Sequence, residues 1–290
     1  MNHATIPAGE ALPEGFRTAG RRTKDGCVVA LAGNPNVGKS TVFNALTGMK
    51  QHTGNWPGKT VASAQGRYSH GEIDYILVDL PGTYSLMAHS AEEEIARDFL
   101  VYGGADATVV VCDATCLERN MNLVLQTLEI TPRVVVLVNL MDEAKKKGIQ
   151  VDLKLLGQEL GVPVIGATAR SGKGLATLRE TIRQVIAAPP PAPRVPRYIT
   201  PVEEAVAYLV PAIDAAEVSI SARWLALRLL SGDAALIEGI KIHLGIDIMA
   251  NAEIVSALEK AQLLLVGSGL DTAEIEDKIV ACLVLCTEEV

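Results

Sequence analysis

Short apolar runs alternate with segments of helical spacing over the first two thirds of the chain. The runs predict five strands, at residues 27–33, 74–80, 107–114, 133–140 and 162–169. Between and after them, apolar positions recur every three or four residues and predict helices at residues 39–46, 92–101, 117–129, 153–160 and 175–187. Strands that alternate with helices form βαβ units, so we expect an α/β fold with a doubly wound, mostly parallel sheet.

The pattern changes after residue 187. The stretch "AAPPPAPRVPRYITP" is rich in proline, which cannot continue a helix, and predicts a semi-rigid linker over residues 188–200. Beyond it the strand signals vanish, and helices are expected at residues 202–209, 222–230, 234–243, 252–265 and 272–285. We therefore expect four parts: a flexible N-terminal extension at residues 1–25, an α/β domain at 26–187, the linker, and a smaller all-helical domain at 201–290.

Composition narrows the class of protein. Apolar residues make up 49% of the chain and charged residues 21%, which is enough to bury a large core. The net charge of −8 argues against a nucleic-acid partner. Five cysteines without a secretory leader indicate a reducing, cytosolic setting. Because no apolar run reaches the roughly 18–20 residues of a membrane span, we expect the chain itself to be soluble.

The clearest chemistry lies in "GNPNVGKST", which follows the first predicted strand and opens a helix. It matches the phosphate-loop pattern G-x-x-x-x-G-K-[ST], in which backbone N–H groups surround phosphates. Lys39 is expected to reach the β- and γ-phosphates, and the Ser40 hydroxyl to bind Mg²⁺. The nucleotide-binding residues predicted here are Gly33, Asn34, Pro35, Asn36, Val37, Gly38, Lys39, Ser40 and Thr41.

Three further motifs, "DLPG", "NLMD" and "TAR", end later strands in the order that a guanine-nucleotide site requires. Asp79 and Gly82 are placed to meet Mg²⁺ and the γ-phosphate. The Asp142 carboxylate can accept two hydrogen bonds from guanine that adenine cannot offer, and a backbone amide of the last motif can reach the guanine carbonyl. The nucleotide-binding residues predicted from these motifs are Asp79, Gly82, Asn139, Met141, Asp142, Thr168, Ala169 and Arg170.

These motifs resemble the first, third, fourth and fifth sequence boxes of the small GTPases related to translation factors. Together with "TGNWPGKTV" and "VDLPGTYSL", they closely resemble the cytosolic GTPase domain of the bacterial ferrous iron transporter family FeoB. The resemblance covers about residues 28–187, and the helical part matches the GDI-like helical domain of that family in position and character. It implies a P-loop GTPase fold and an enzyme that hydrolyses GTP to GDP and phosphate.

The missing second box requires a threonine that binds Mg²⁺ in the GTP state, within a segment that is released in the other state. Thr60 is the best placed, with Gly58 and Lys59 expected beside the nucleotide and Asp79 reaching Mg²⁺ through a water molecule. The competing threonines, which lie too near the first helix or lack the extended segment that follows, are Thr41, Thr47 and Thr53.

The resemblance also implies K⁺, coordinated by the Asn36 side chain and by the backbone carbonyls of Gly54 and Trp56. A cation there neutralises charge that develops between the β- and γ-phosphates. Two plainer roles stay open: Asn36 as a turn former and Trp56 as a hydrophobic plug at the sheet edge. The expected cofactors are GTP or GDP, Mg²⁺ and K⁺, and the expected catalytic residues are Asn36, Lys39, Thr60 and Gly82.

Two residues depart from the general GTPase pattern. Thr83 follows Gly82 at the position where many GTPases have a glutamine that orients water, so intrinsic hydrolysis should be slow. Leu140 stands where a lysine often packs over the base, which predicts weaker nucleotide binding and faster GDP release.

As a partner, the resemblance implies a ferrous iron pore at the cytoplasmic face of the bacterial inner membrane. The pore would be the chain's own C-terminal membrane domain, absent here, or a separate protein, and the resemblance favours the former. A homo-oligomer remains open. Two alternatives are a soluble GTPase of ribosome or tRNA maturation and a guanine-nucleotide sensor with negligible hydrolysis. The cysteines predicted to be core thiols rather than iron ligands are Cys112, Cys116, Cys282 and Cys286.

Overall fold

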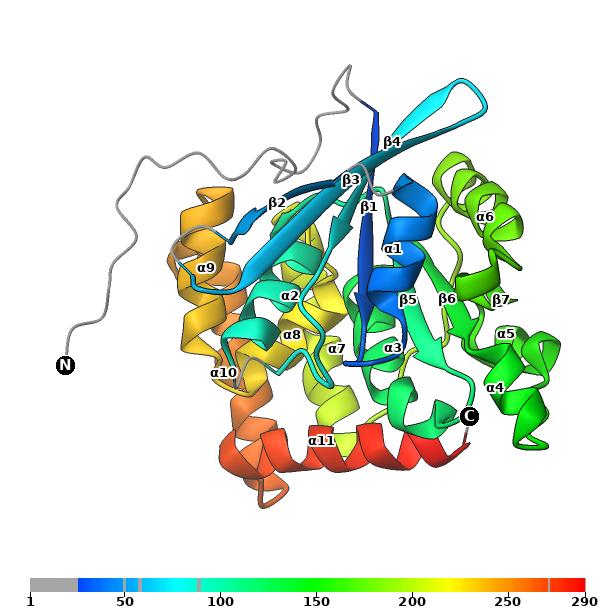
Figure 1. The fold of residues 1–290 in the computed structure, drawn as a ribbon. Helices are drawn as coiled ribbons and strands as arrows, with labels where there is room; N and C mark the ends of the chain where they lie inside the picture. Colours follow the sequence, from blue (N-terminus) through cyan, green and yellow to red (C-terminus); the bar gives the residue numbers. More distant parts are fainter. Residues whose placement is uncertain (1–25, 49–50, 57–58, 88–89, 271, 290) are drawn as a thin grey trace.

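The computed structural model describes residues 26–48, 51–56, 59–87, 90–270 and 272–289 (Figure 1). Their strands form a seven-stranded sheet in the order β2-β3-β4-β1-β5-β6-β7. The strands are β1 Cys27–Gly33, β2 Gln51–Asn55, β3 Ala62–His70, β4 Ile73–Asp79, β5 Ala107–Asp113, β6 Val134–Asn139 and β7 Val164–Gly166. The predicted N-terminal extension at residues 1–25 and the predicted nucleotide contact Gly58 lie outside the described residues.

Five strands of the sheet run parallel, and they are the five that the apolar runs predict. β1 pairs parallel with β4 and β5, and β6 pairs parallel with β5 and β7, whereas β3 is antiparallel to both β2 and β4. The hairpin of β2 and β3 is additional to the expectation, because "ASAQGRYSH" has few apolar side chains and is ordered by pairing with β4. Since parallel strands end at one edge, the loops after β1, β4, β6 and β7 meet there.

Helices cover both faces of this sheet (Figure 1). α1 and α6 pack on one face with Val29 and Leu31 of β1, while α2, α3 and α5 pack on the other with Val28 and Ala30. Successive residues of a strand point to opposite faces, so β1 is buried on both sides, as parallel strands are. The helices of this part are α1 Lys39–Thr47, α2 Ala91–Tyr102, α3 Leu117–Ile130, α4 Met141–Lys146, α5 Leu153–Leu160 and α6 Leu175–Ala187.

The helical part that follows lies where helical spacing predicts it. Its helices are α7 Thr200–Ala215, α8 Ala222–Leu230, α9 Ala234–Leu244, α10 Ala252–Gly267 and α11 Thr272–Glu289. The main difference is α7, which continues past Pro211. Leu209 and Ile213 are buried on either side of this proline, and their burial outweighs the lost backbone hydrogen bond. Over the described ranges, none of the helices has both the length and the apolar content of a membrane span.

The two parts share one hydrophobic core. A single cluster of buried apolar side chains extends from Phe99 and Leu128, on the α2 and α3 face of the sheet, to Val202, Trp224 and Leu225 of the helical part. A common core of this kind resists separation of the two parts, because separating them would expose apolar surface to water.

The proline-rich linker also lies against the α/β part. The Arg194 N–H donates to the Leu160 carbonyl (3.0 Å), and the buried Tyr198 donates its hydroxyl to Glu129 Oε1 of α3 (2.8 Å). Burial raises the pKa of Glu129 to about 7, although the hydrogen bond from Tyr198 acts in the opposite direction. The linker is therefore ordered by contacts with α3 and α5.

Candidate nucleotide site

The phosphate loop runs from the end of β1 to the start of α1. Asn36 and Gly38 both have left-handed backbone conformations, with φ of 66° and 84°. Asparagine tolerates this conformation better than most side chains. At Gly38 an added Cβ would lie 2.4 Å from Asn139 Nδ2, so this position also requires the absence of a side chain. The loop thus turns tightly and leaves the N-terminus of α1 facing it, as phosphate binding needs.

Asn139, at the end of β6, joins three parts of the site. Its side chain is buried; Nδ2 donates to the Val37 carbonyl of the phosphate loop (3.0 Å), and Oδ1 accepts the Ala169 N–H after β7 (3.0 Å). Its backbone carbonyl accepts the Ala114 N–H at the end of β5 (3.0 Å). One buried amide therefore positions the phosphate loop relative to the strand ends predicted to recognise guanine.

Lys39, at the start of α1, and Asp79, at the end of β4, form an ion pair. Burial raises the pKa of Asp79, while the Lys39 ammonium lowers it. Both side chains are largely buried, whereas Ser40 and Thr41 are exposed in the first turn of α1. Carboxylate and hydroxyl oxygens are ligands that Mg²⁺ prefers, so Asp79 and Ser40 fit the predicted Mg²⁺ site.

The segment after β4 lies against the phosphate loop. An added Cβ at Gly82 would lie 3.3 Å from Pro35 Cα, and the Thr83 N–H donates to the Gly33 carbonyl (3.3 Å). Thr83 is buried, and its hydroxyl donates to the Ser85 carbonyl (2.7 Å). The side chain that occupies the position of the water-orienting glutamine is therefore engaged within its own turn.

The "NLMD" motif forms a tight turn between β6 and α4. Leu140 has φ of 60°, a left-handed conformation that costs a leucine about 1–2 kcal/mol. The turn is held by the Met141 N–H, which donates to the Ala167 carbonyl (3.1 Å), and by the Ala144 N–H, which donates to the Leu140 carbonyl (3.0 Å). Asp142 follows, half-buried, in the first turn of α4. Strain of this kind is typical of functional turns.

The last motif lies in a short 3₁₀ turn, Ala169–Ser171, that follows β7. The Thr168 N–H donates to the Lys173 carbonyl (3.0 Å), and Arg170 is exposed. The Ala169 amide donates to Asn139 Oδ1 (3.0 Å), and the contact expected between an amide of this motif and the guanine carbonyl stays a prediction.

The β2–β3 hairpin carries the predicted second box, and Trp56 anchors it. Trp56 is 3% exposed and packs edge-on against Phe99 of α2, with ring centroids 5.7 Å apart. The backbone N–H of Trp56 donates to the Val61 carbonyl (2.9 Å), and its backbone carbonyl accepts the Lys59 N–H (3.0 Å). Lys59 also pairs with Glu94 of α2 (2.9 Å). Trp56 is thus a buried anchor in the α2 face of the core, and the cation role of its carbonyl stays a prediction. The exposed hairpin residues predicted to bind cations are Gly54 and Thr60.

Helix α3 supplies contacts that the motifs did not predict. Asn34, buried in the phosphate loop, donates from Nδ2 to the Arg119 carbonyl (3.2 Å). The Arg119 guanidinium lies over the Tyr84 ring, 4.4 Å from its centroid. Gln126, two turns further along the same face of α3, is buried and accepts a hydrogen bond from the Leu86 N–H. The available signal was the spacing of Arg119, Asn122 and Gln126, three and four residues apart along one helix.

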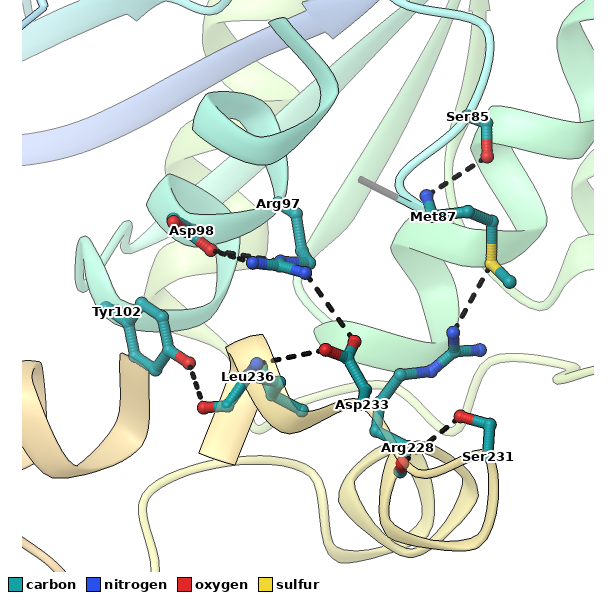
Figure 2. Close-up of polar contacts among 9 residues, drawn as sticks. All are labelled: Ser85, Met87, Arg97, Asp98, Tyr102, Arg228, Ser231, Asp233 and Leu236. Carbon is teal, nitrogen blue, oxygen red and sulfur yellow. Dashed lines mark hydrogen bonds and ion pairs between the residues drawn. The ribbon is translucent and has the colours of Figure 1, made fainter. Parts of the chain in front are cut away.

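Figure 2 shows where the helical part contacts α2 and the segment after Gly82. Arg97 of α2 is buried and pairs with Asp98 (2.8 Å) and with Asp233 of the helical part (3.6 Å). From the other side, Arg228 of α8 donates to the Met87 sulfur (3.3 Å). The helical part therefore contacts both α2 and the segment after Gly82.

The cysteines do not form a metal centre among the described residues, where no group of three or more His, Cys, Asp and Glu side chains comes together. Cys112 is buried, and burial raises the pKa of its thiol, as expected for a core thiol. The same expectation is wrong for Cys116, which is exposed, because the chain leaves the sheet after Asp113. Cys282 and Cys286 are half-buried, with sulfur atoms 3.9 Å apart.

The phosphate loop and the "DLPG" and "NLMD" turns, gathered at one edge of a mostly parallel sheet, define a G domain of the P-loop GTPase class, followed by a helical domain. The family model of ferrous iron transport protein B matches residues 27–182, and the model of the FeoB cytosolic helical domain matches residues 198–283. The chain belongs to the FeoB family.

Individual relatives agree with this assignment. The chain is 37% identical over 209 residues to the Fe(2+) transporter FeoB of Salmonella choleraesuis (strain SC-B67). The matched region covers 71% of this chain and 27% of the relative. The chain thus spans about a quarter of the length of that curated relative. The cytosolic domain of L. pneumophila FeoB is similar in structure, with a TM-score of 0.74, 28% identity and coverage of 90% of this chain and 96% of that one.

A variant of S. thermophilus NFeoB bound to GDP has a TM-score of 0.74 and 28% identity, covering 91% of this chain and 98% of that one. The match of the helical part to a FeoB domain removes the basis of the alternative GTPase of ribosome or tRNA maturation, which requires a basic RNA-binding appendage.

Proposed function

We propose that this chain binds GTP and hydrolyses it slowly, as the regulatory part of a ferrous iron transporter at the cytoplasmic face of the bacterial inner membrane. The observation that carries the proposal is Asn139, whose buried amide joins the phosphate loop to the guanine motifs. The GDP bound to the S. thermophilus relative supports guanine specificity here.

Residues of the phosphate loop and of the later motifs would bind the phosphates and the base of the nucleotide. The amides of the phosphate loop and the N-terminus of α1 face the phosphates. Lys39 exchanges its contact with Asp79 for the β- and γ-phosphates, which releases that carboxylate toward Mg²⁺. Asp142 accepts two hydrogen bonds from guanine, and the Arg170 amide donates to the guanine carbonyl.

The donor sets fit the expected cations. Ser40, Thr60 and, through water, Asp79 would hold Mg²⁺. The Asn36 side chain with the carbonyls of Gly54 and Trp56 would hold K⁺, since amide and carbonyl oxygens are suitable ligands for a hard cation. When bound, the two cations neutralise charge that develops between the β- and γ-phosphates.

Two segments would change position according to whether GTP or GDP is bound. Thr60 moves toward Mg²⁺ and Gly82 toward the γ-phosphate in the GTP state. Because Thr83 is bonded to Ser85, the segment after Gly82 offers no side chain like the usual glutamine, which supports slow turnover. The contacts of Arg228 and Asp233 would pass the state to the helical part. From there it reaches the membrane pore, the chain's own C-terminal membrane domain or a separate protein, with a homo-oligomer as a further option.

The test is GTP hydrolysis by this chain in KCl and in NaCl, with Asn36→Ala as the variant. We expect faster turnover in KCl, and loss of the difference in Asn36→Ala with GDP affinity retained. Equal rates in both salts for the unmodified chain would contradict the K⁺ role, and failure to bind GDP would contradict the function as a whole.

A second candidate is a guanine-nucleotide sensor with negligible hydrolysis, and the engaged hydroxyl of Thr83 favours it. It predicts tight, Mg²⁺-dependent GTP binding without measurable phosphate release in either salt. Single-turnover phosphate release from bound GTP separates the two candidates directly.

A further inference from the structure

A stripe of polar side chains on α3 faces the segment that follows Gly82. Arg119, Asn122 and Gln126 are spaced three and four residues apart, so they share one face of the helix. The Arg119 guanidinium covers the Tyr84 ring (4.4 Å), and Asn122 Nδ2 donates to the Tyr84 carbonyl (3.1 Å). All three side chains thus contact the segment around residues 84–86, about forty positions earlier in the chain.

Gln126 makes the closest of these contacts. Its Oε1 accepts the Leu86 N–H (2.6 Å), and its Nε2 donates to Asn122 Oδ1 (3.0 Å). The Ser85 hydroxyl lies 3.3 Å from both atoms of the amide. The side chain is 5% exposed, so its partners are shielded from water. Only an amide, with an acceptor and a donor on adjacent atoms, satisfies the Leu86 N–H and the Asn122 oxygen together.

The position of Gly82 and Thr83 depends on how this segment is held. Leu80 and Leu86 are buried at its two ends. Between them, the Thr83 N–H contacts the phosphate loop through Gly33 (3.3 Å), and beyond them the Met87 N–H donates to the Ser85 hydroxyl (3.1 Å; Figure 2). Loss of the Gln126 acceptor would leave the Leu86 N–H buried and unpaired, which favours release of the segment.

We propose that Gln126, supported by Asn122 and Arg119, positions the segment after Gly82 for hydrolysis without touching the nucleotide. This inference rests on the proposed function. The amide holds the backbone at Leu86, and thereby limits how far Gly82 and Thr83 move when the γ-phosphate is present. These residues are positioning residues, because they act through the chain of the segment and not on the reacting atoms.

The first test is kinetic and uses Gln126→Met, which keeps the volume and removes both hydrogen bonds. We expect the single-turnover rate of GTP hydrolysis to fall about tenfold while the affinity for a fluorescent GDP analogue stays within about twofold. Gln126→Glu should recover part of the rate, because a carboxylate still accepts the Leu86 N–H but cannot donate to Asn122. An unchanged rate in Gln126→Met would overturn the proposal.

Thr127→Val is the matched control. Thr127 is as buried as Gln126. Its hydroxyl donates to the Leu123 carbonyl within α3 (2.7 Å) and not to the segment after Gly82. A purely structural role of Gln126 predicts that both variants lower the unfolding midpoint and GDP affinity together, and that outcome also contradicts the proposal.

Amide hydrogen exchange tests the positioning even if the proposed hydrolysis fails. In protein loaded with GDP or with a non-hydrolysable GTP analogue, we expect the peptide that contains Leu86 to exchange about tenfold faster in Gln126→Met, with β5 unchanged. Unaltered exchange would refute the role of Gln126, whereas absent hydrolysis by the unmodified chain would refute only the proposed function.

Discussion

Arg97 of α2 and Asp233, the N-cap residue of α9, face each other across the boundary between the α/β part and the helical part, 3.6 Å apart (Figure 2). The Arg97 side chain is 5% exposed and also pairs with Asp98 of its own helix. Asp233 at the same time accepts the Leu236 N–H (2.9 Å), so one carboxylate caps α9 and neutralises a buried charge from the other part. This pair therefore links α2 directly to the start of α9.

Asp233→Asn should separate these two roles. The amide oxygen still caps α9, but the charge that faces Arg97 is lost, and we expect the free energy of unfolding to fall by about 1–3 kcal/mol. Asp233→Ala, which also removes the cap, should cost about 1 kcal/mol more. Urea denaturation of both variants measures the difference. Equal stability of Asp233→Asn and the unmodified chain would show that Asp98 alone satisfies Arg97.

Asn139→Asp tests the bridge between the phosphate loop and the guanine motifs. The carboxylate still accepts the Ala169 N–H but cannot donate to the Val37 carbonyl, and it places a negative charge beside the phosphates. We expect GDP affinity to fall at least about tenfold. Isothermal titration calorimetry measures the affinity, and circular dichroism checks that the sheet is retained. Affinity equal to that of the unmodified chain would contradict the bridging role.

Asp142→Asn should change which base is bound. The asparagine amide cannot accept the two guanine N–H groups, so affinity for GDP is expected to fall about ten- to a hundredfold. Xanthine carries a carbonyl where guanine carries its amino group, and the asparagine NH₂ can donate to it. Competition between GDP and xanthosine diphosphate for a fluorescent nucleotide measures the switch. Unaltered preference for GDP would place guanine recognition elsewhere.

Glu129 predicts a pH dependence of stability. Burial raises its pKa from 4.5 to about 7, in surroundings that include Tyr198, Arg228, Arg223 and Glu203. Between these two values the folded chain keeps a proton that the unfolded chain has lost. The contribution of Glu129 to the free energy of unfolding should therefore be largest below about pH 4.5, fall by at most about 3 kcal/mol as the pH rises to about 7, and then level off.

Glu129→Gln is the control for this dependence, because its amide still accepts the Tyr198 hydroxyl and does not titrate. The difference in unfolding free energy between the unmodified chain and Glu129→Gln, measured in urea from pH 5 to pH 8, isolates the carboxyl group from the histidines. A difference that does not vary with pH would show that Glu129 is ionised throughout.

Much of the fold follows from local patterns. The apolar runs of the parallel strands stand out because these strands are buried on both faces, as β1 shows with Val28 and Val29 packed on opposite sides. The start of α1 follows from the phosphate-loop pattern, and α5 and α8 lie at the predicted residues. β3 was not predicted as a strand because only two of its nine residues are buried and its order comes from pairing with β4.

The candidate site also contains residues that the sequence predicts and residues that only the structure reveals. Lys39, Asp79, Asn139 and Asp142 could be named in advance, because each lies in a contiguous motif whose spacing reflects the geometry of the nucleotide. Gln126 could not, since its role depends on Leu86, 40 positions away along the chain. The exposure of Cys116 likewise depends on where the chain leaves the sheet, which spacing alone does not reveal.

The sequence by itself predicted a guanine-nucleotide site and determined the division into an α/β part and a helical part, because phosphate-loop motifs, base-recognition motifs and helix periodicity all lie in short, contiguous stretches. The tertiary structure alone decided that Trp56 anchors its hairpin on Phe99, that α3 holds the segment after Gly82, and that Arg97 and Arg228 join the two parts. Those contacts join residues far apart in the chain, and only packing around a common core brings them together.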